Sequence, residues 1–260
     1  MIRKLLIAVI LLFGSMRADA GFYSDIWFNP GKPGFGYNLF QTGPLIFATF
    51  FVYDSNNEPT WYVATLFADI NGNFRGDVYA TTGTYFASPW QAGDYTEGIV
   101  GFATFSPSNP YKGTFQFSVN GKGISSVDIE RQTLLAQDFR GFYAGGQGAD
   151  YSSCVVPSVE GFYNATFNLT AEQENALQIT LRFELNDGRI CTLAGDLIQN
   201  GLLYRSPGAT YVCSGPSDIS TTAELAELKR TAQGIEGRFR APNGLGGCTE
   251  SVGFSAAFLF

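Results

Sequence analysis

The chain has 260 residues, of which 15% are aromatic and 15% charged, and its formal net charge is −7. It contains no histidine, which excludes Ser-His-Asp and Cys-His nucleophile systems and histidine-ligated zinc or copper. Acidic side chains outnumber basic ones by 23 to 16 without any basic cluster, so neither nucleic acid nor an anionic membrane surface is expected as a partner.

The first 20 residues have the layout of an export signal. Arg3 and Lys4 precede an apolar run from Leu5 to Phe13 that is too short to cross a bilayer as a helix. Ala18-Asp19-Ala20 then supplies the small residues of a cleavage site. We therefore expect a secreted or periplasmic protein that begins at Gly21 and matures in an oxidising compartment.

Short strand-like runs separated by turn residues make up the first half. Asn71-Gly72 and Asn120-Gly121 are typical of tight hairpins. The glycine-rich stretch from Asp138 to Ser153 is expected to be an exposed connection, and we place a domain boundary between residues 145 and 146. The expected strands are 35–40, 45–53, 60–68, 75–81, 99–105, 111–119 and 124–131.

The second half repeats this style. Leu177 to Leu185 alternates between apolar and polar residues, which predicts a strand with one buried and one wet face. Asn200-Gly201 predicts a hairpin turn between two further runs. Thr221 to Thr231 is compatible with a short helix or a strand. The other expected strands are 161–169, 189–199, 202–213, 234–240 and 251–259.

These patterns predict an all-β protein with two small antiparallel meander barrels or sandwiches in tandem. Residues 21–145 would form an aromatic-rich domain and residues 146–260 a disulfide-containing domain.

All four cysteines lie in the second half, at Cys154, Cys191, Cys213 and Cys248. In an exported chain they are expected to form two disulfides, and their spacing lacks the close pair that a zinc site needs. Three connectivities are possible. We favour Cys191 with Cys213 across the hairpin, which leaves Cys154 to pair with Cys248.

Aromatic and glycine motifs mark the first half, and cysteine motifs mark the second. They are Asp25-Ile26-Trp27-Phe28-Asn29-Pro30, Gly34-Phe35-Gly36-Tyr37-Asn38-Leu39, Glu58-Pro59-Thr60-Trp61-Tyr62, Asp187-Gly188-Arg189-Ile190-Cys191 and Tyr211-Val212-Cys213-Ser214. Together they resemble the N-terminal and C-terminal modules of secreted bacterial β-rich proteins of unassigned function. The resemblance implies no activity.

Four rings are the candidate ligand-binding residues. Trp27, Tyr37 and Trp61 either fill the interior of a small barrel, which we favour for the rings of this motif, or line a ligand site. Trp90 lies in the loop-like segment 88–93 and is the best candidate for an exposed ring that stacks on a sugar. No catalytic residue, metal or cofactor is predicted.

The leading functional hypothesis is a non-catalytic binding or interaction protein whose ligand is a glycan, an apolar small molecule or a protein. A second hypothesis is a carboxylate-dependent extracellular hydrolase that uses Asp94, Glu97 or Asp25 as acids. The alternating C-terminal run from Phe254 to Phe260 raises a third, an outer-membrane β-barrel. Against the third, Phe50-Phe51-Val52-Tyr53 breaks the alternation that membrane strands need, and many strands are short.

Overall fold

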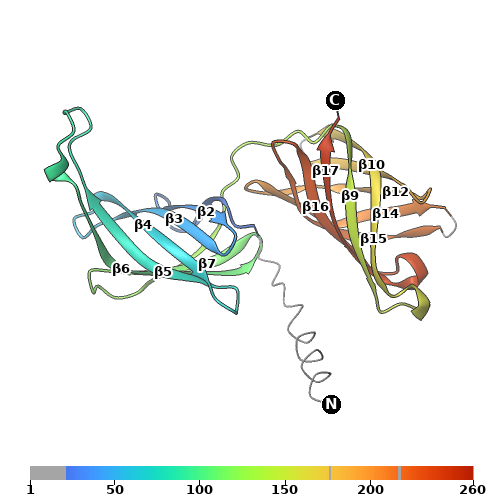
Figure 1. The fold of residues 1–260 in the computed structure, drawn as a ribbon, viewed down its shortest axis with the longest axis horizontal. Helices are drawn as coiled ribbons and strands as arrows, with labels where there is room; N and C mark the ends of the chain where they lie inside the picture. Colours follow the sequence, from blue (N-terminus) through green and yellow to red (C-terminus); the bar gives the residue numbers. More distant parts are fainter. Residues whose placement is uncertain (1–21, 176, 216–217, 260) are drawn as a thin grey trace, which may run out of the picture. The chain divides into compact units, whose positions relative to one another are not determined.

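The computed structural model of the protein describes residues 22–175, 177–215 and 218–259. The predicted export signal, residues 1–20, lies outside the described residues. The fold is all-β, as predicted, and the described residues include short 3-10 turns at Ala92–Asp94, Pro157–Val159 and Leu245–Gly247. Across the described ranges, no helix is long and apolar enough to span a bilayer. The chain divides after Glu130 into two compact units, and each is an antiparallel β structure (Figure 1).

The first unit is a closed barrel in which eight strands follow one another in chain order. Each strand pairs antiparallel with the next, from β1 to β8, through hairpin connections. The strands are β1 Asp25–Phe28, β2 Gly36–Thr42, β3 Leu45–Tyr53, β4 Pro59–Ala68, β5 Phe74–Thr82, β6 Thr96–Asn109, β7 Lys112–Val119 and β8 Ser125–Arg131.

Alternation along each strand separates the interior of this barrel from its exterior. In β3, Ile46, Ala48 and Phe50 are buried, whereas Phe47 and Phe51 are exposed. Successive side chains of a strand point to opposite faces, so adjacent phenylalanines have opposite environments. The interior is packed with rings and aliphatic side chains: Trp27, Tyr37, Leu39, Ile46, Phe50, Val52, Leu66, Phe74, Val78, Phe105, Phe115, Val127 and Ile129.

Glycines allow the strands to approach closely where the barrel curves. A Cβ at Gly101 would lie 1.8 Å from the carbonyl oxygen of Ser118 on the neighbouring strand, so no side chain fits there. The β7–β8 turn contains Asn120 and Gly121 with φ of 53° and 67°. Both values suit the tight hairpin that this pair of residues predicted.

The second unit also closes on itself. Its sheet has the order β12-β11-β10-β9-β17-β16-β15-β14-β13, and β12 pairs with β14 as well. That pairing completes a ring of eight strands, with the short β13 as an addition beside β14. The strands are β9 Gly141–Ser152, β10 Gly161–Asn175, β11 Gln178–Leu185, β12 Ile190–Asp196, β13 Ile198–Asn200, β14 Leu203–Ser214, β15 Ile219–Arg230, β16 Gly234–Ala241 and β17 Thr249–Phe258.

Two disulfides staple the second unit, and both predicted pairings are confirmed. Cys191 and Cys213 are direct cross-strand partners on β12 and β14. Cys154 and Cys248 join the segment after β9 to the residue before β17. Two disulfides are consistent with maturation in an oxidising compartment.

Two expectations from the sequence are wrong. The glycine-rich stretch Asp138 to Ser153 is not a connection, because Gly141–Ser152 forms β9, which pairs with β10 on one side and β17 on the other. The boundary therefore lies at 130/131 rather than 145/146. Glycine here permits close packing: a Cβ at Gly145 would lie 2.1 Å from the carbonyl oxygen of Ser255.

The run 221–231, which the sequence left open between helix and strand, falls in strand β15 up to Arg230.

Candidate functional site

The four predicted ligand-binding rings fall into two environments. Trp27 and Tyr37 are fully buried, whereas Trp61 and Trp90 are 50% and 65% exposed. Trp27 pairs with Tyr37 across β1 and β2, and both side chains point into the barrel. The indole Nε1 of Trp27 donates a hydrogen bond to the carbonyl oxygen of Tyr23 at 3.0 Å. Trp27 and Tyr37 therefore belong to the core, where no ligand reaches them without opening the barrel.

Trp61 forms an exposed aromatic pair with Phe51. The two residues are direct partners across β3 and β4, and both side chains lie on the outer face. On the other side of β3, Phe51 pairs with Gly36, at which a Cβ would have no neighbour within 4 Å. The exposed Tyr53 ends the strand. The two exposed side chains are thus cross-strand neighbours on the outer face, at the end of the barrel where residues 54–58 join β3 to β4.

The strand register places this pair at the base of a long hairpin. Val63 of β4 pairs with Tyr79 of β5. Because the strands are antiparallel, Trp61 lies toward Thr81, close to the point where β5 and β6 leave the barrel. Residues 83–95 connect these two strands and are called the arm below. Figure 1 shows the arm projecting beyond β5 and β6.

The arm carries four exposed rings on an ordered backbone. They are Tyr85, Phe86, Trp90 and Tyr95, and Phe86 is 91% exposed. The hydroxyl of Thr84 donates to Asp94 Oδ2 at 2.9 Å, and the backbone N–H of Gln91 donates to the Thr84 hydroxyl at 2.8 Å. At the base of the arm, Thr82 Oγ1 and Thr96 Oγ1 lie 2.8 Å apart. These bonds tie the two sides of the arm together below the ring-bearing tip.

Trp90 is held in place by contacts within the arm. Its ring packs on the backbone of Gly83, where an added Cβ would lie 3.7 Å from the indole. The Tyr95 ring centroid is 6.4 Å from that of Trp90. The Tyr95 hydroxyl in turn donates to Glu97 Oε2 at 2.7 Å, and this bond raises the pKa of Tyr95. Trp90 is therefore an exposed ring with two neighbours inside the arm, which limits the side-chain freedom that it loses on binding a ligand.

We call this set of seven exposed rings the aromatic end: Phe51, Tyr53, Trp61, Tyr85, Phe86, Trp90 and Tyr95. The other side of the same barrel is polar. The outward residues of β7 and β8 include Thr114, Gln116, Ser126 and Asp128, and Thr114 bonds to Asp128 at 2.8 Å. Further exposed apolar side chains lie along the outer faces of β2, β3, β4 and β6, at Phe40, Phe47, Phe67, Ile99 and Phe102. The exposed apolar surface therefore covers one side of the barrel and continues onto the arm, as at an interaction site.

The sequence predicted an exposed ring at Trp90, which is confirmed, and favoured an interior position for Trp61, which is wrong because its side chain lies on the outer face of β4. The other five rings were missed. A signal for Phe51 and Tyr53 was present, because strict alternation from Ile46 makes odd-numbered residues of β3 point outward. No sequence pattern marked Tyr85 and Phe86 as exposed, because side chains in an irregular connection do not alternate regularly between two faces.

The three carboxylates considered for hydrolysis are divided between separate elements. Asp94 and Glu97 lie in or beside the arm, and both are exposed and hydrogen-bonded to hydroxyls. Asp25 lies on β1, where Oδ1 accepts the backbone N–H of Ile26 at 2.8 Å. β1 and β6 are not neighbours in the barrel. Asp94 and Glu97 are thus near each other in the chain, and each accepts a hydrogen bond from a nearby hydroxyl group.

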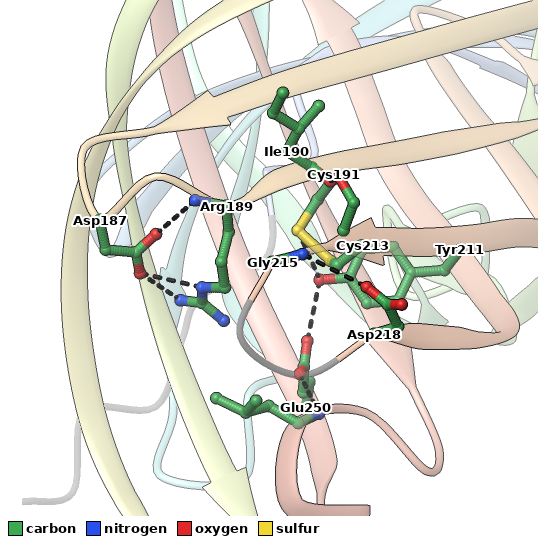
Figure 2. Close-up of a disulfide and its surroundings, with 11 residues drawn as sticks. Asp187, Arg189, Ile190, Cys191, Tyr211, Cys213, Gly215, Asp218 and Glu250 are labelled. Carbon is green, nitrogen blue, oxygen red and sulfur yellow. Dashed lines mark hydrogen bonds and ion pairs between the residues drawn. A yellow bond between two sulfur atoms is a disulfide. The ribbon is translucent and has the colours of Figure 1, made fainter.

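A polar cluster in the second barrel, which the sequence did not predict, lies beside the Cys191–Cys213 disulfide (Figure 2). Glu250 is fully buried on β17. Its Oε2 accepts the Tyr211 hydroxyl at 3.0 Å, and its Oε1 accepts the backbone N–H of Leu245 at 2.6 Å. Burial raises the pKa of Glu250, and burial next to this carboxylate also raises that of Tyr211.

Arg189 lies in the same cluster and forms an ion pair with Asp187 at 2.8 Å. Hydrogen bonding to Arg189 lowers the pKa of Asp187.

Glu250 holds the loop before Cys248, so its contacts are structural. Its inward position follows from the alternation of Cys248, Glu250 and Val252, all buried.

No protein-family model matches the chain, and no curated protein is detectably similar to it.

Proposed function

We propose that this protein is an exported, non-catalytic binding protein whose ligand contacts the aromatic end of the first barrel. The observation that carries the proposal is the exposed Phe51–Trp61 pair at the base of an ordered, ring-bearing arm. Tyrosine and tryptophan supply large contact areas at low entropy cost, and they dominate the energetics of many binding surfaces.

The composition supports binding rather than catalysis. Without histidine, acid–base chemistry near neutral pH would fall to carboxylates. Asp94 on the arm and Glu97 at the start of β6 each accept a hydrogen bond from a nearby hydroxyl and are exposed to solvent. A glycosidase instead places its two carboxyl groups on opposite sides of the scissile bond within a cleft. The hydrolase hypothesis therefore has less support than binding.

The distribution of polarity in the first barrel also differs from that of an outer-membrane barrel. Membrane barrels carry a continuous apolar band on the outside and polar side chains within. Here rings such as Phe50, Phe105 and Phe115 fill the interior, and the outer faces of β7 and β8 are polar. This pattern supports a barrel with a packed core and a one-sided binding surface.

Export is part of the proposal. The leader-like residues 1–20 and the two disulfides of the second barrel both support maturation in the periplasm or outside the cell. Fractionation of the native host tests this directly: a full-length cytoplasmic protein with four free thiols would contradict it.

The binding proposal is tested with a ligand panel and matched ring substitutions. The panel contains neutral oligosaccharides, basic and acidic peptides, and long-chain fatty acids, applied to the wild type and to Trp61→Ala, Phe51→Ala and Trp90→Ala. Phe162→Ala is the control, because Phe162 is an equally exposed ring on the second barrel. We expect the first three substitutions to weaken binding about tenfold or more and the control to leave it unchanged. Reproducible hydrolysis of a panel member by the wild type would overturn the non-catalytic assignment.

A further inference from the structure

Asp94 is the one charged residue of the arm, and the carboxylate of Glu97 follows it at the start of β6. Between Arg75 and Lys112 the chain contains no lysine or arginine, whereas Asp77, Asp94 and Glu97 lie in this interval. Arg75 is seven residues from Thr82 along β5, roughly 23 Å at the rise of an extended strand. That is beyond the screening length of about 10 Å at physiological salt. The base of the arm therefore has an acidic environment, from Asp94 and Glu97, that Arg75 does not neutralise.

Lys122 is the lysine that the β7–β8 hairpin brings to this end of β6. It lies in the β7–β8 turn, where Asn120 donates its backbone N–H to the carbonyl oxygen of Val100. Val100 is three residues from Glu97, about 10 Å along the strand. Lys122 thus belongs to the base of β6, below the rings of the arm.

The rings of the arm lie next to the carboxylates of Asp94 and Glu97. Tyr95 bonds to Glu97 and contacts Trp90, and Asp94 accepts the Thr84 hydroxyl within the same hairpin. Each carboxylate has about four acceptor positions, so one hydrogen bond leaves capacity for a ligand. Ring faces attract cations, and the attraction adds to that of a neighbouring carboxylate.

From this combination we infer that the arm binds a cationic polypeptide segment, one that presents lysine or arginine side chains to the rings. The inference rests on the proposed function and names the class of ligand for that same site. A chain-like ligand fits because the four rings are spread from Tyr85 to Tyr95 over both sides of the hairpin. Polyanions and anionic bilayers are repelled by the same carboxylates.

Three probes separate the classes of ligand: a short peptide that alternates lysine and glycine, its glutamate counterpart, and a neutral β-linked oligosaccharide. Affinity is measured by calorimetry for the wild type, for Trp90→Ala, and for the double variant Asp94→Asn with Glu97→Gln. The amide side chains keep the acceptor for the hydroxyls of Thr84 and Tyr95 and remove only the charge. Glu224→Gln is the charge control, because it removes one exposed carboxylate from the second barrel.

We expect the lysine peptide to bind the wild type, and both Trp90→Ala and the double amide variant to weaken it about tenfold. Raising the salt from about 50 to about 500 mM is expected to weaken wild-type binding and to have little effect on the amide variant. Glu224→Gln is expected to change affinity less than twofold. Thermal melts of every variant serve as the control that the barrel remains folded.

Two results would overturn the inference while leaving the binding proposal in place. One is ring-dependent binding of the oligosaccharide or the glutamate peptide without binding of the lysine peptide. The other is binding of the lysine peptide that Glu224→Gln weakens as much as the arm variants do, since this would reflect net charge alone. If no probe or member of the wider panel binds, or if no binding depends on the rings, the proposed function fails with it.

Discussion

The hydroxyl of Tyr211 donates a hydrogen bond to the buried carboxylate of Glu250 at 3.0 Å, within the second barrel (Figure 2). The other carboxylate oxygen accepts the backbone N–H of Leu245, in the turn that precedes Cys248. A buried carboxylate thus links two strands and the loop of a disulfide.

Replacing Glu250 with alanine is expected to destabilise the second barrel by about 2–4 kcal/mol, because two buried donors lose their acceptor. All three tryptophans, Trp27, Trp61 and Trp90, lie in the first barrel. Tryptophan fluorescence therefore reports the unfolding of the first barrel, whereas circular dichroism reports both barrels. The transition that is seen by circular dichroism but not by fluorescence measures the unfolding of the second barrel. A change below about 0.5 kcal/mol would contradict the structural role of this carboxylate.

The same residue predicts a pH dependence of stability. Burial raises the pKa of Glu250 in the folded state above its ordinary value. Between the unfolded and folded pKa values the folded state binds more protons, so stability contributed by this group decreases as pH rises. Relative to Glu250→Gln, the wild type is expected to be more stable near pH 4.5 than near pH 7, as measured by urea unfolding at both pH values. The opposite slope would show that the carboxylate is stabilised in its charged form.

Tyr37 has a buried hydroxyl without a hydrogen-bond partner among the described residues. Burial raises its pKa to about 12. Because an unpaired buried hydroxyl costs about 1–3 kcal/mol, Tyr37→Phe is expected to raise the stability of the first barrel by about 1 kcal/mol. Urea unfolding followed by tryptophan fluorescence measures the change. A loss of more than about 1 kcal/mol would indicate that the hydroxyl has a bound water as its partner.

Phe50 and Phe51 test the assignment of the two faces of β3. Phe50 is buried against Tyr37, Phe115 and Phe117, whereas Phe51 lies outside. Phe50→Ala is expected to cost about 3–5 kcal/mol in the free energy of unfolding. Phe51→Ala is expected to cost less than about 0.5 kcal/mol. Similar losses for the two variants would contradict the register of this strand.

The two disulfides are expected to differ in their contribution to stability. Cys154–Cys248 spans 94 residues and Cys191–Cys213 spans 22. The chain-entropy model gives roughly 4.7 and roughly 3.4 kcal/mol for closed loops of these lengths. Removing each pair as a double alanine variant is expected to destabilise the second barrel more when the longer loop is opened. The reverse order would show that local packing outweighs loop length.

Local properties of the sequence determined the class of fold and favoured, among three possible connectivities, the disulfide pairing that the structure shows. Alternation at 177–185 requires a strand because only a period of two separates its apolar and polar residues. Asn120-Gly121 specified a hairpin because both residues tolerate positive φ. Cys191 and Cys213 flank a short hairpin, so their pairing followed from chain connectivity.

Tertiary structure decided which glycines are paired and whether Trp27 and Trp61 are buried or exposed, whereas the exposure of Trp90 was expected from its loop-like segment. A glycine-rich segment has the same local sequence pattern whether it forms a strand such as β9 or a loop. Only the pairing of β9 with β17 shows that this segment is a strand. Trp27 and Trp61 have similar local sequences of apolar residues, yet one is buried and the other exposed. That difference depends on which face of each strand turns inward when the barrel closes, and closure is set by pairing between strands rather than by any one of them.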